Sequence, residues 1–241
     1  IPAAGKRAGI STYICVARIP GMEGNDRKDM KLSAEDAQIL NQMLDLKREN
    51  PLVKLGLILN VSGPVDLALW EHELDGIFCM FLPGMEGGHA MADILTGRVN
   101  PSGKLPLTFP KKYQDTPTYL NFPGDGYQVN YGEGIYVGYR YYDKKMVEPL
   151  YPFGHGLSYS HFEISNERAI GEQSPVEIIY PDGKVDNKKM PVFTDSIKIA
   201  VDVINQGPEE FSEGMEVVQL YISDPYASIS KPVKELKAFK K

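Results

Sequence analysis

Two glutamates stand in the same five-residue setting, which places a carboxylate between a proline–glycine turn and another glycine. The sequence PGMEG occurs at 20–24, where it contains Glu23, and again at 83–87, where it contains Glu86. A positioned carboxyl group that exchanges a proton is a tool of general acid–base catalysis. Because the two copies share no similarity beyond these five letters, we interpret the match as coincidence and not as an internal repeat.

The surroundings of the two copies differ. Each follows an apolar run of strand length, at 10–17 and 75–83, and loops at the carboxyl ends of parallel strands form the ligand-binding edge of open α/β sheets. Glu86 starts a predicted helix, whose N-terminus stabilises the charged carboxylate, so a structural glutamate is favoured over a general acid there. Glu23 lies in a loop from about 18 to 32, which is long for a strand–helix connection and typical of functional loops.

Small and charged residues surround Glu23. Gly21 and Gly24 allow the backbone to approach a ligand closely, and a pair of Asp26 with Arg27 would pin the loop. On these residues alone, a solvated surface glutamate is favoured over a catalytic one.

Alternating strands and helices predict the scaffold that carries these loops. Strands are expected at 10–17, 54–61 and 75–83. A first helix is expected after the N-cap Ser33, with Glu35 and Asp36 in its first turn and apolar residues at helical spacing, namely Ala37, Leu40, Met43 and Leu44. A second is expected from Val65 to about His72. A third is expected over GGHAMADIL, with Gly97 placed to end it. This order predicts a parallel sheet covered on both faces, so residues 1–100 belong to a doubly wound α/β domain.

The character of the chain changes after residue 100. Residues 101–164 are rich in Pro, Gly and aromatic residues and are expected to form an extended connection. In the tail, Ile197, Ile199, Val201 and Val203 alternate as in a half-buried strand, and Val218, Leu220 and Ile222 share one face. Such strands predict a β-sandwich, which needs about 100 residues and seven strands. We therefore expect an α/β domain over 1–164 and an incomplete sandwich over 165–241.

Composition and charge argue against several classes of partner. The 241 residues are 42% hydrophobic and 24% charged, as in soluble globular proteins, and the net charge of -6 disfavours nucleic acid or an anionic membrane surface. No apolar run reaches the roughly 18–20 residues that cross a bilayer. The two cysteines, Cys15 and Cys79, lie in apolar runs and are expected to be buried thiols and not a disulfide or a metal site.

Both ends of the chain look cut. It begins with IPAAGKRAG, without an initiator methionine, and stops at KELKAFKK in mid-pattern. We expect a fragment of a longer polypeptide. Because the N-terminus looks cut, the lack of a visible signal peptide decides nothing, and secreted, periplasmic and cytoplasmic locations all stay open.

Several long stretches resemble glycoside hydrolase family 3, the β-glucosidase family. RIPGMEGNDRKDMKLSAED is similar to the family's Gly-Glu-Gly…Asp-Arg loop, and LILNVSGPVDLALW to its strand–Gly-Pro–helix–Trp segment. DGIFCMFLPGMEGGHAMADILTGRVNPSGKLPLTFPK resembles its most recognisable stretch, and EGIYVGYRYYDKKMVEPLYPFGHGLSYSHFE continues in register. EVVQLYISDPYASISKPVKELKAFKK resembles the family's fibronectin type III-like module. The resemblance covers nearly the whole chain, apart from about 168–195.

The resemblance implies a split active site. In this family a (β/α)₈ barrel donates an aspartate nucleophile, and an α/β-sandwich domain donates a glutamate acid/base on a loop. No part of this chain resembles the barrel, so the barrel is an expected partner from outside the chain. The position that matches the acid/base is Glu23, and the resemblance turns the balance there toward catalysis.

The implied activity is retaining hydrolysis of terminal β-D-glucosyl residues of a carbohydrate, without a cofactor or metal. The fragment alone is expected to be inactive. Two alternatives stay open, namely β-xylosidase or another exo-glycosidase of the family, and a catalytically inactive carbohydrate-binding or scaffolding module. Association into a homo-oligomer also stays open.

Other candidate residues are expected to be structural. An aromatic run is expected to pack where the fibronectin-like module meets the sandwich, and not to stack on sugars; it comprises Tyr136, Tyr139, Tyr141, Tyr142, Tyr151, Phe153 and Tyr159. His155 is expected to be hydrogen-bonded and structural, and His89 to lie on a helix surface or interface. His72 and His161 have no partners at ligand spacing. Glu133 is expected to be structural, with a contact at the rim of the active site as the alternative.

Overall fold

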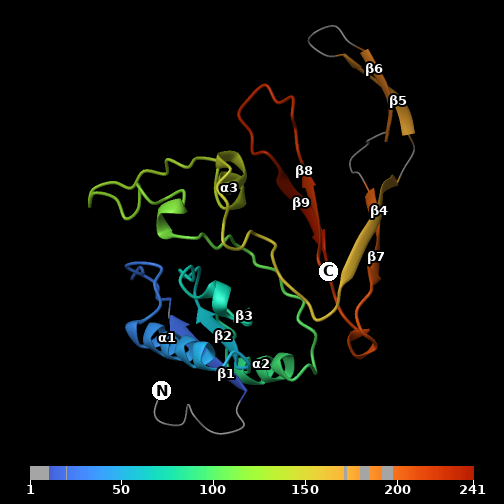
Figure 1. Ribbon diagram of the computed structural model, residues 1–241. Helices are drawn as coiled ribbons and strands as arrows, with labels where there is room; N and C mark the ends of the chain where they lie inside the picture. Colours follow the sequence, from blue (N-terminus) through green and yellow to red (C-terminus); the bar gives the residue numbers. More distant parts are fainter. Residues whose placement is uncertain (1–10, 20, 171–172, 180–184, 192–197) are drawn as a thin grey trace. The chain divides into compact units, whose positions relative to one another are not determined.

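The computed structural model of the chain describes residues 11–19, 21–170, 173–179, 185–191 and 198–241 (Figure 1). The chain divides into two compact units. Unit one comprises residues 1–99, 103–157 and 217–241, and unit two comprises residues 100–102 and 158–216.

A parallel sheet forms the centre of unit one. Its strands are β1 (Thr12–Ile19), β2 (Lys54–Val61) and β3 (Gly76–Cys79), in the order β1-β2-β3. The strands predicted from the apolar runs are confirmed, although β3 is shorter than expected. It ends because Phe81 has a φ of +53°, a left-handed value that extended backbone does not adopt.

Helix α1 (Ala34–Glu49) packs on β1 and β2 and covers one face of the sheet (Figure 1). Ser33 is the N-cap, as predicted, and its hydroxyl accepts a hydrogen bond of 3.0 Å from the Asp36 N–H. The buried helix residues are Leu40, Met43 and Leu44. They join the strand side chains in one core cluster, and each fully buried leucine stabilises the fold by about 1.5–3 kcal/mol.

The other face of the sheet is open over β1. Ile14 is 43% exposed and Val16 is 58% exposed. Cys15 and Ala17, which alternate with them on the opposite face, are buried. Among the residues that the structure describes, the second cover expected for the sheet is therefore not seen over β1. Further along the same face, on β2, Ile58 is buried.

Helix α2 (Gly87–Leu95) confirms the third predicted helix. Glu86 is its N-cap residue, and Gly97, with a φ of +74°, lies just past its end and donates its N–H to the Ile94 carbonyl at 2.9 Å.

The helix predicted from Val65 to His72 is wrong. Val65 and Leu67, two residues apart, are both fully buried, which is a spacing of extended backbone. The Asp66 side chain accepts from the Ala68 N–H at 3.3 Å, and a turn begins only there. It leads into the short 3₁₀ helix η2 (Glu71–Glu73).

The stretch from 100 to 138 contains the 3₁₀ helix η3 (Tyr113–Asp115) and is otherwise irregular, in line with the predicted extended connection. Helix α3 (Tyr139–Lys145) follows and was not predicted. It begins after Gly138, whose φ is +58°, and ends at Met146 in the left-handed conformation. Its aromatic sequence YRYYDKK carries no clear helical periodicity.

The antiparallel strands β8 (Val218–Ile222) and β9 (Glu235–Lys240) complete unit one. Tyr139 of α3 packs against them, since its ring centroid lies 5.7 Å from that of Tyr221 and its hydroxyl accepts from the Leu236 N–H at 2.8 Å. Phe153 also packs on Tyr139, with the two ring centroids 5.1 Å apart. The predicted packing role of the aromatic run is confirmed for these two rings.

Unit two contains two antiparallel pairs. Strand β4 (Phe162–Ile170) pairs with β7 (Lys198–Asn205), and β5 (Gln173–Ile179) pairs with β6 (Val185–Pro191). The 3₁₀ helix η4 (Glu209–Phe211) follows.

The alternating pattern in the tail correctly predicts strands, and β7 is one of them. Its expected buried face is not seen, because Ile199 is 41% exposed and Val203 is 44% exposed. Ile197, which starts the pattern, lies outside the described residues. Among the helices that the structure describes, none has the length and apolar character to cross a membrane.

Candidate active site

Glu23 occupies the tip of a tight turn at the carboxyl end of β1. Met22 and Asn25 pair across the turn, and the Asn25 N–H donates to the Met22 carbonyl at 3.4 Å. Gly24 has a φ of +74°, which glycine adopts without the steric cost of a Cβ. Glu23 is exposed, and within the described residues its carboxylate has no hydrogen-bond or ion-pair partner. The turn therefore presents an available carboxylate.

Arg27 anchors the loop that carries this turn. Its Nη1 donates a hydrogen bond of 3.0 Å to the carbonyl of Pro64, in the loop after β2. Asp26 is exposed and does not pair with Arg27, so the predicted Asp–Arg pair is wrong. Burial lowers the pKa of Arg27, and the charge of Asp29 acts in the opposite direction.

Two further contacts join the loops after β1 and β2. Gly21 lies so close to Ser62 that a Cβ on Gly21 would stand 2.5 Å from the serine Cβ. The Asp66 N–H donates to the Met30 carbonyl at 2.8 Å. Because β1 and β2 are parallel neighbours, both loops leave the same edge of the sheet, which is the ligand-binding edge of open α/β folds.

Glu86, the glutamate of the second PGMEG copy, lies at the start of α2, as the sequence predicts. Its Oε2 lies 2.6 Å from the Nδ1 of His89, one helical turn later. Both side chains are strongly exposed, which confirms the expected surface position of His89. The shared pentapeptide therefore serves two different local structures.

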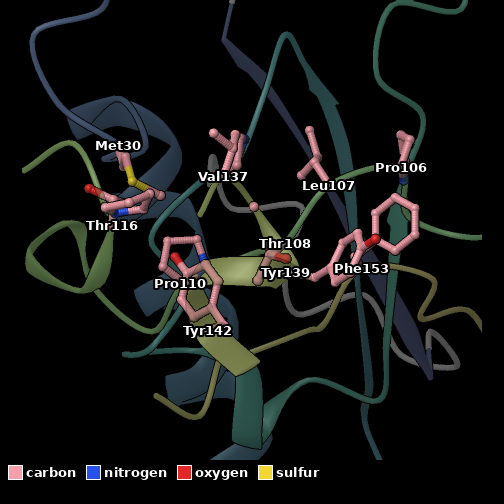
Figure 2. Close-up of a pocket in the computed structure, with 13 residues that line it drawn as sticks. Met30, Pro106, Leu107, Thr108, Pro110, Thr116, Val137, Tyr139, Tyr142 and Phe153 are labelled. Carbon is pink, nitrogen blue, oxygen red and sulfur yellow. The ribbon is translucent and has the colours of Figure 1, made fainter. Parts of the chain in front are cut away.

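An apolar cavity of about 370 Å³ lies beside the anchored loop (Figure 2). Met30 and Pro64 line it together with prolines and aromatic rings. The hydroxyl of Thr116 donates to the Tyr113 carbonyl at 2.8 Å, whereas Thr108 Oγ1 is buried and has no partner among the described residues. Such a lining lacks the many donors and acceptors that sugar hydroxyls require, so we do not assign a sugar to it.

His155 is structural, as expected. Its ring stacks on Tyr151, with centroids 5.1 Å apart, and its carbonyl accepts from the Leu105 N–H at 2.8 Å. Burial, followed by the nearby charge of Lys104, lowers the pKa of His155. The ring is therefore a neutral packing group near pH 7.

Both cysteines are free thiols, as predicted. Cys15 is buried in the core, and burial, with a smaller contribution from the charge of Asp36, raises its pKa to about 11. Cys79 is half-buried, and burial raises its pKa as well. Among the described residues no group of three His, Cys, Asp or Glu side chains is placed to hold a metal ion.

Sequence reasoning missed the residues that support the Glu23 loop. Ser62 and Pro64 hold it by a close contact and by a carbonyl acceptor. The available signal was the sequence SGP directly after a buried strand, which marks a loop at the ligand-binding edge of the sheet.

Two family models match the chain. The glycosyl hydrolase family 3 C-terminal domain matches residues 4–159, and the fibronectin type III-like domain matches residues 216–241.

Curated relatives match this chain over part of much longer proteins. Probable beta-glucosidase I of Aspergillus niger is 40% identical over 219 residues, which cover 91% of this chain and 24% of that protein. Thermostable beta-glucosidase B of Acetivibrio thermocellus is 40% identical over 241 residues, which cover 98% of this chain and 28% of that protein. The chain thus spans about a quarter of the length of the curated relatives it matches.

Solved structures show the same fold. Beta-glucosidase 3B from Thermotoga neapolitana in complex with glucose has a TM-score of 0.78 and 35% identity, over 95% of this chain and 30% of that one. Beta-glucosidase from Kluyveromyces marxianus in complex with glucose has a TM-score of 0.76 and 34% identity, over 95% of this chain and 24% of that one. With these folds and the match over residues 4–159, the chain belongs to glycosyl hydrolase family 3, as its C-terminal domain followed by fibronectin type III-like sequence.

Proposed function

We propose that this chain is part of a retaining β-glucosidase that hydrolyses terminal β-D-glucosyl residues, and that Glu23 is its general acid/base. The observation that carries the proposal is the exposed, unpartnered Glu23 carboxylate on a turn that Arg27 anchors at the carboxyl edge of the sheet. The names of relatives about 40% identical to the chain support the substrate class.

The chemistry needs two carboxyl groups. In retaining glycosidases they lie about 5–5.5 Å apart; one attacks the anomeric carbon, and the other protonates the leaving oxygen and later deprotonates a water. Glu23 takes the second role. An aspartate from a barrel domain outside this chain takes the first, and its negative charge favours the protonated form of Glu23 before the reaction. The covalent intermediate removes that charge, which favours the carboxylate form for the second step.

Substitution of Glu23 in the full-length protein tests this role. Glu23→Ala is expected to lower kcat for substrates with poor leaving groups by about 10²–10⁴-fold, because these substrates depend on proton donation. Azide is expected to restore part of the turnover of substrates with good leaving groups, because it attacks the covalent intermediate without a general base. The matched control is Glu86→Ala, which removes the equivalent carboxylate of the other PGMEG copy and is expected to leave kcat unchanged. An unchanged kcat in Glu23→Ala would refute the assignment.

Substrate choice and domain organisation complete the proposal. Values of kcat/KM on a panel of β-linked aryl glycosides are expected to be highest for glucose, and a preference for xylose would instead assign a β-xylosidase. Absence of turnover on the whole panel would assign a carbohydrate-binding or scaffolding module.

We retain the division into an α/β domain over 1–164 and a fibronectin type III-like domain over 165–241, with the family matches at 4–159 and 216–241 in support.

A further inference from the structure

Unit one contains a second cavity, of about 580 Å³, between the segments 113–121 and 132–145 and the loop at Ser230. Its volume lies within the range of small-molecule binding sites. None of its lining residues belongs to the loop of Glu23. In contrast to the apolar cavity, its walls combine aromatic rings with amide, carboxylate and ammonium groups.

Two tyrosine rings in the walls are oriented by rings behind them. Tyr119 packs edge-on against Tyr113, with centroids 5.1 Å apart and an interplanar angle of 86°. Tyr141 packs edge-on against the buried Tyr142, at 5.5 Å and 88°. Tyr119 is 38% exposed. Rings held in this way offer a preformed apolar surface to a ligand, and little side-chain entropy is lost when the ligand binds.

A third ring is fixed by polar contacts. The hydroxyl of Tyr136 lies 2.5 Å from the Oγ of Ser230, and the Nζ of Lys144 lies 5.8 Å from the centre of the Tyr136 ring. The cavity thus has ordered walls on the side of α3 and on the side of the Ser230 loop.

Glu133 places a carboxylate in this cavity. Its Oε2 is buried and has no hydrogen-bond partner within the described residues. The backbone holds the residue in a turn, in which the Tyr136 N–H donates to the Glu133 carbonyl at 3.0 Å. A buried acceptor without a donor is unfavourable, and a ligand hydroxyl would supply the missing hydrogen bond. Asn121 also lines the cavity and lies against Gly132, the residue before Glu133, since a Cβ on Gly132 would stand 2.8 Å from the Asn121 Nδ2.

The lining favours a neutral polyhydroxylated ligand over the other classes. An anion such as phosphate is attracted by Lys144 and Lys145 but repelled by Glu133, and a cationic amine meets the opposite balance, so neither charge suits the whole lining. A purely apolar ligand would leave the Glu133 oxygen without a donor. A saccharide meets both requirements, because its hydroxyls donate to the carboxylate and accept from the amide of Asn121, and its C–H face packs on aromatic rings.

We propose that this cavity binds a saccharide unit, with the Glu133 carboxylate as hydrogen-bond acceptor and the rings of Tyr119 and Tyr141 as apolar walls. The site does not depend on the proposed role of Glu23, because it requires binding and no turnover.

Hydrogen exchange on the full-length protein, followed by mass spectrometry of peptides, tests the site with thiocellobiose, whose sulfur linkage resists hydrolysis. Saturating thiocellobiose is expected to slow exchange in peptides from 113–121 and 131–145. Glu133→Ala is expected to weaken this protection so that about tenfold more ligand or more is needed, because a hydrogen bond to a charged group is lost. Tyr119→Ala removes a partly exposed ring, so it leaves the core intact, and is expected to weaken protection as well. The matched control is the exposed Glu210→Ala, with unchanged protection.

Three outcomes would overturn the proposal. These are no protection of either segment at saturating thiocellobiose, equal protection in the wild-type protein and in both cavity variants, and stronger protection by inorganic phosphate than by the sugar. Because binding is measured without turnover, a protein in which Glu23 proves dispensable still gives a clear result.

Discussion

The guanidinium of Arg27 and the carbonyl of Pro64 are joined by a hydrogen bond of 3.0 Å that ties the loop after β1 to the loop after β2. The two residues are 37 positions apart in the sequence. Their contact makes the position of the Glu23 turn depend on a second strand of the sheet and not on β1 alone.

Loss of this hydrogen bond is expected to impair catalysis more than stability. In the full-length enzyme, Arg27→Ala should lower kcat by about 10- to 100-fold for poor leaving groups, because small displacements of a catalytic group cost this much. Substrates with good leaving groups should lose less, since they need less help from Glu23. The control is Lys28→Ala, an exposed neighbour. An equal loss for both substrate classes would show that Arg27 acts through general stability and not by positioning Glu23.

Gly21 is expected to tolerate no side chain while Ser62 faces it. In Gly21→Ala the new Cβ would stand 2.5 Å from the Ser62 Cβ and 2.9 Å from its Oγ, so one of the two loops must move. We expect a destabilisation of about 1–3 kcal/mol, measured by urea unfolding. The double variant with Ser62→Gly removes both contacting atoms and should recover most of the loss. No recovery would place the cause elsewhere.

The two glycines that open α2 are expected to respond oppositely to alanine. A Cβ on Gly88 meets no atom within 4 Å, so Gly88→Ala should raise the free energy of unfolding by about 0.5–1 kcal/mol through helix propensity. A Cβ on Gly87 would stand 2.5 Å from the rigid ring of Pro83, so Gly87→Ala should destabilise the protein. Thermal unfolding of the two single variants checks both signs, and shifts of equal sign would contradict the close approach of Pro83.

Asp75 is expected to make stability depend on pH. Its carboxylate accepts hydrogen bonds from Lys47 of α1 at 2.7 Å, from the Leu55 N–H at 2.9 Å and from Lys54 at 3.0 Å. These contacts, led by Lys47, hold its pKa well below its usual range, against a smaller opposing effect of burial. A carboxyl group with a depressed pKa stabilises the fold above its unfolded pKa, near 4, and loses this contribution as the pH falls through its folded pKa.

Asp75→Asn should therefore lower the free energy of unfolding by about 1 kcal/mol at pH 7, measured by urea titration. The difference from the wild-type protein should shrink as the pH falls below about 4. Asp45→Asn, which alters an exposed pair with Arg48, is the control and should show a smaller effect at both pH values. A difference that stays constant from pH 7 to pH 3 would contradict the role of the charge.

Most of the sheet and its first helix follow from the local sequence. Strand β2 is a continuous apolar run of strand length, which predicts a buried strand. Ser33 precedes α1 and has a side chain suited to an N-cap. The prediction of a helix from Val65 is wrong because the apolar residues there, Val65, Leu67 and Trp70, are buried in the core and do not form one face of a helix. Helix α3 was missed for the converse reason, since its aromatic residues are placed by contacts with β8 and β9.

Some features of the candidate site could likewise be predicted from the local sequence, and others could not. The turn residues around Glu23 and the helix start at Glu86 are local features, which a sequence displays directly. The hydrogen bond of Arg27 to the Pro64 carbonyl is not local. The sequence suggests Asp26 as the partner because it is adjacent, and only the fold shows that Pro64 takes this place. The burial of the unpartnered Glu133 oxygen could not be predicted from the sequence either, because it depends on residues that the fold places around it.

The open face of β1 has a practical consequence for handling this chain. Ile14 and Val16 present apolar side chains, and within the described residues β1 pairs with a neighbouring strand along one side only. A strand of this kind is a template on which other chains can add. We therefore expect preparations limited to these residues to aggregate as concentration rises. Ile14→Lys or Val16→Lys should keep them dispersed without disturbing the buried face that carries Cys15 and Ala17.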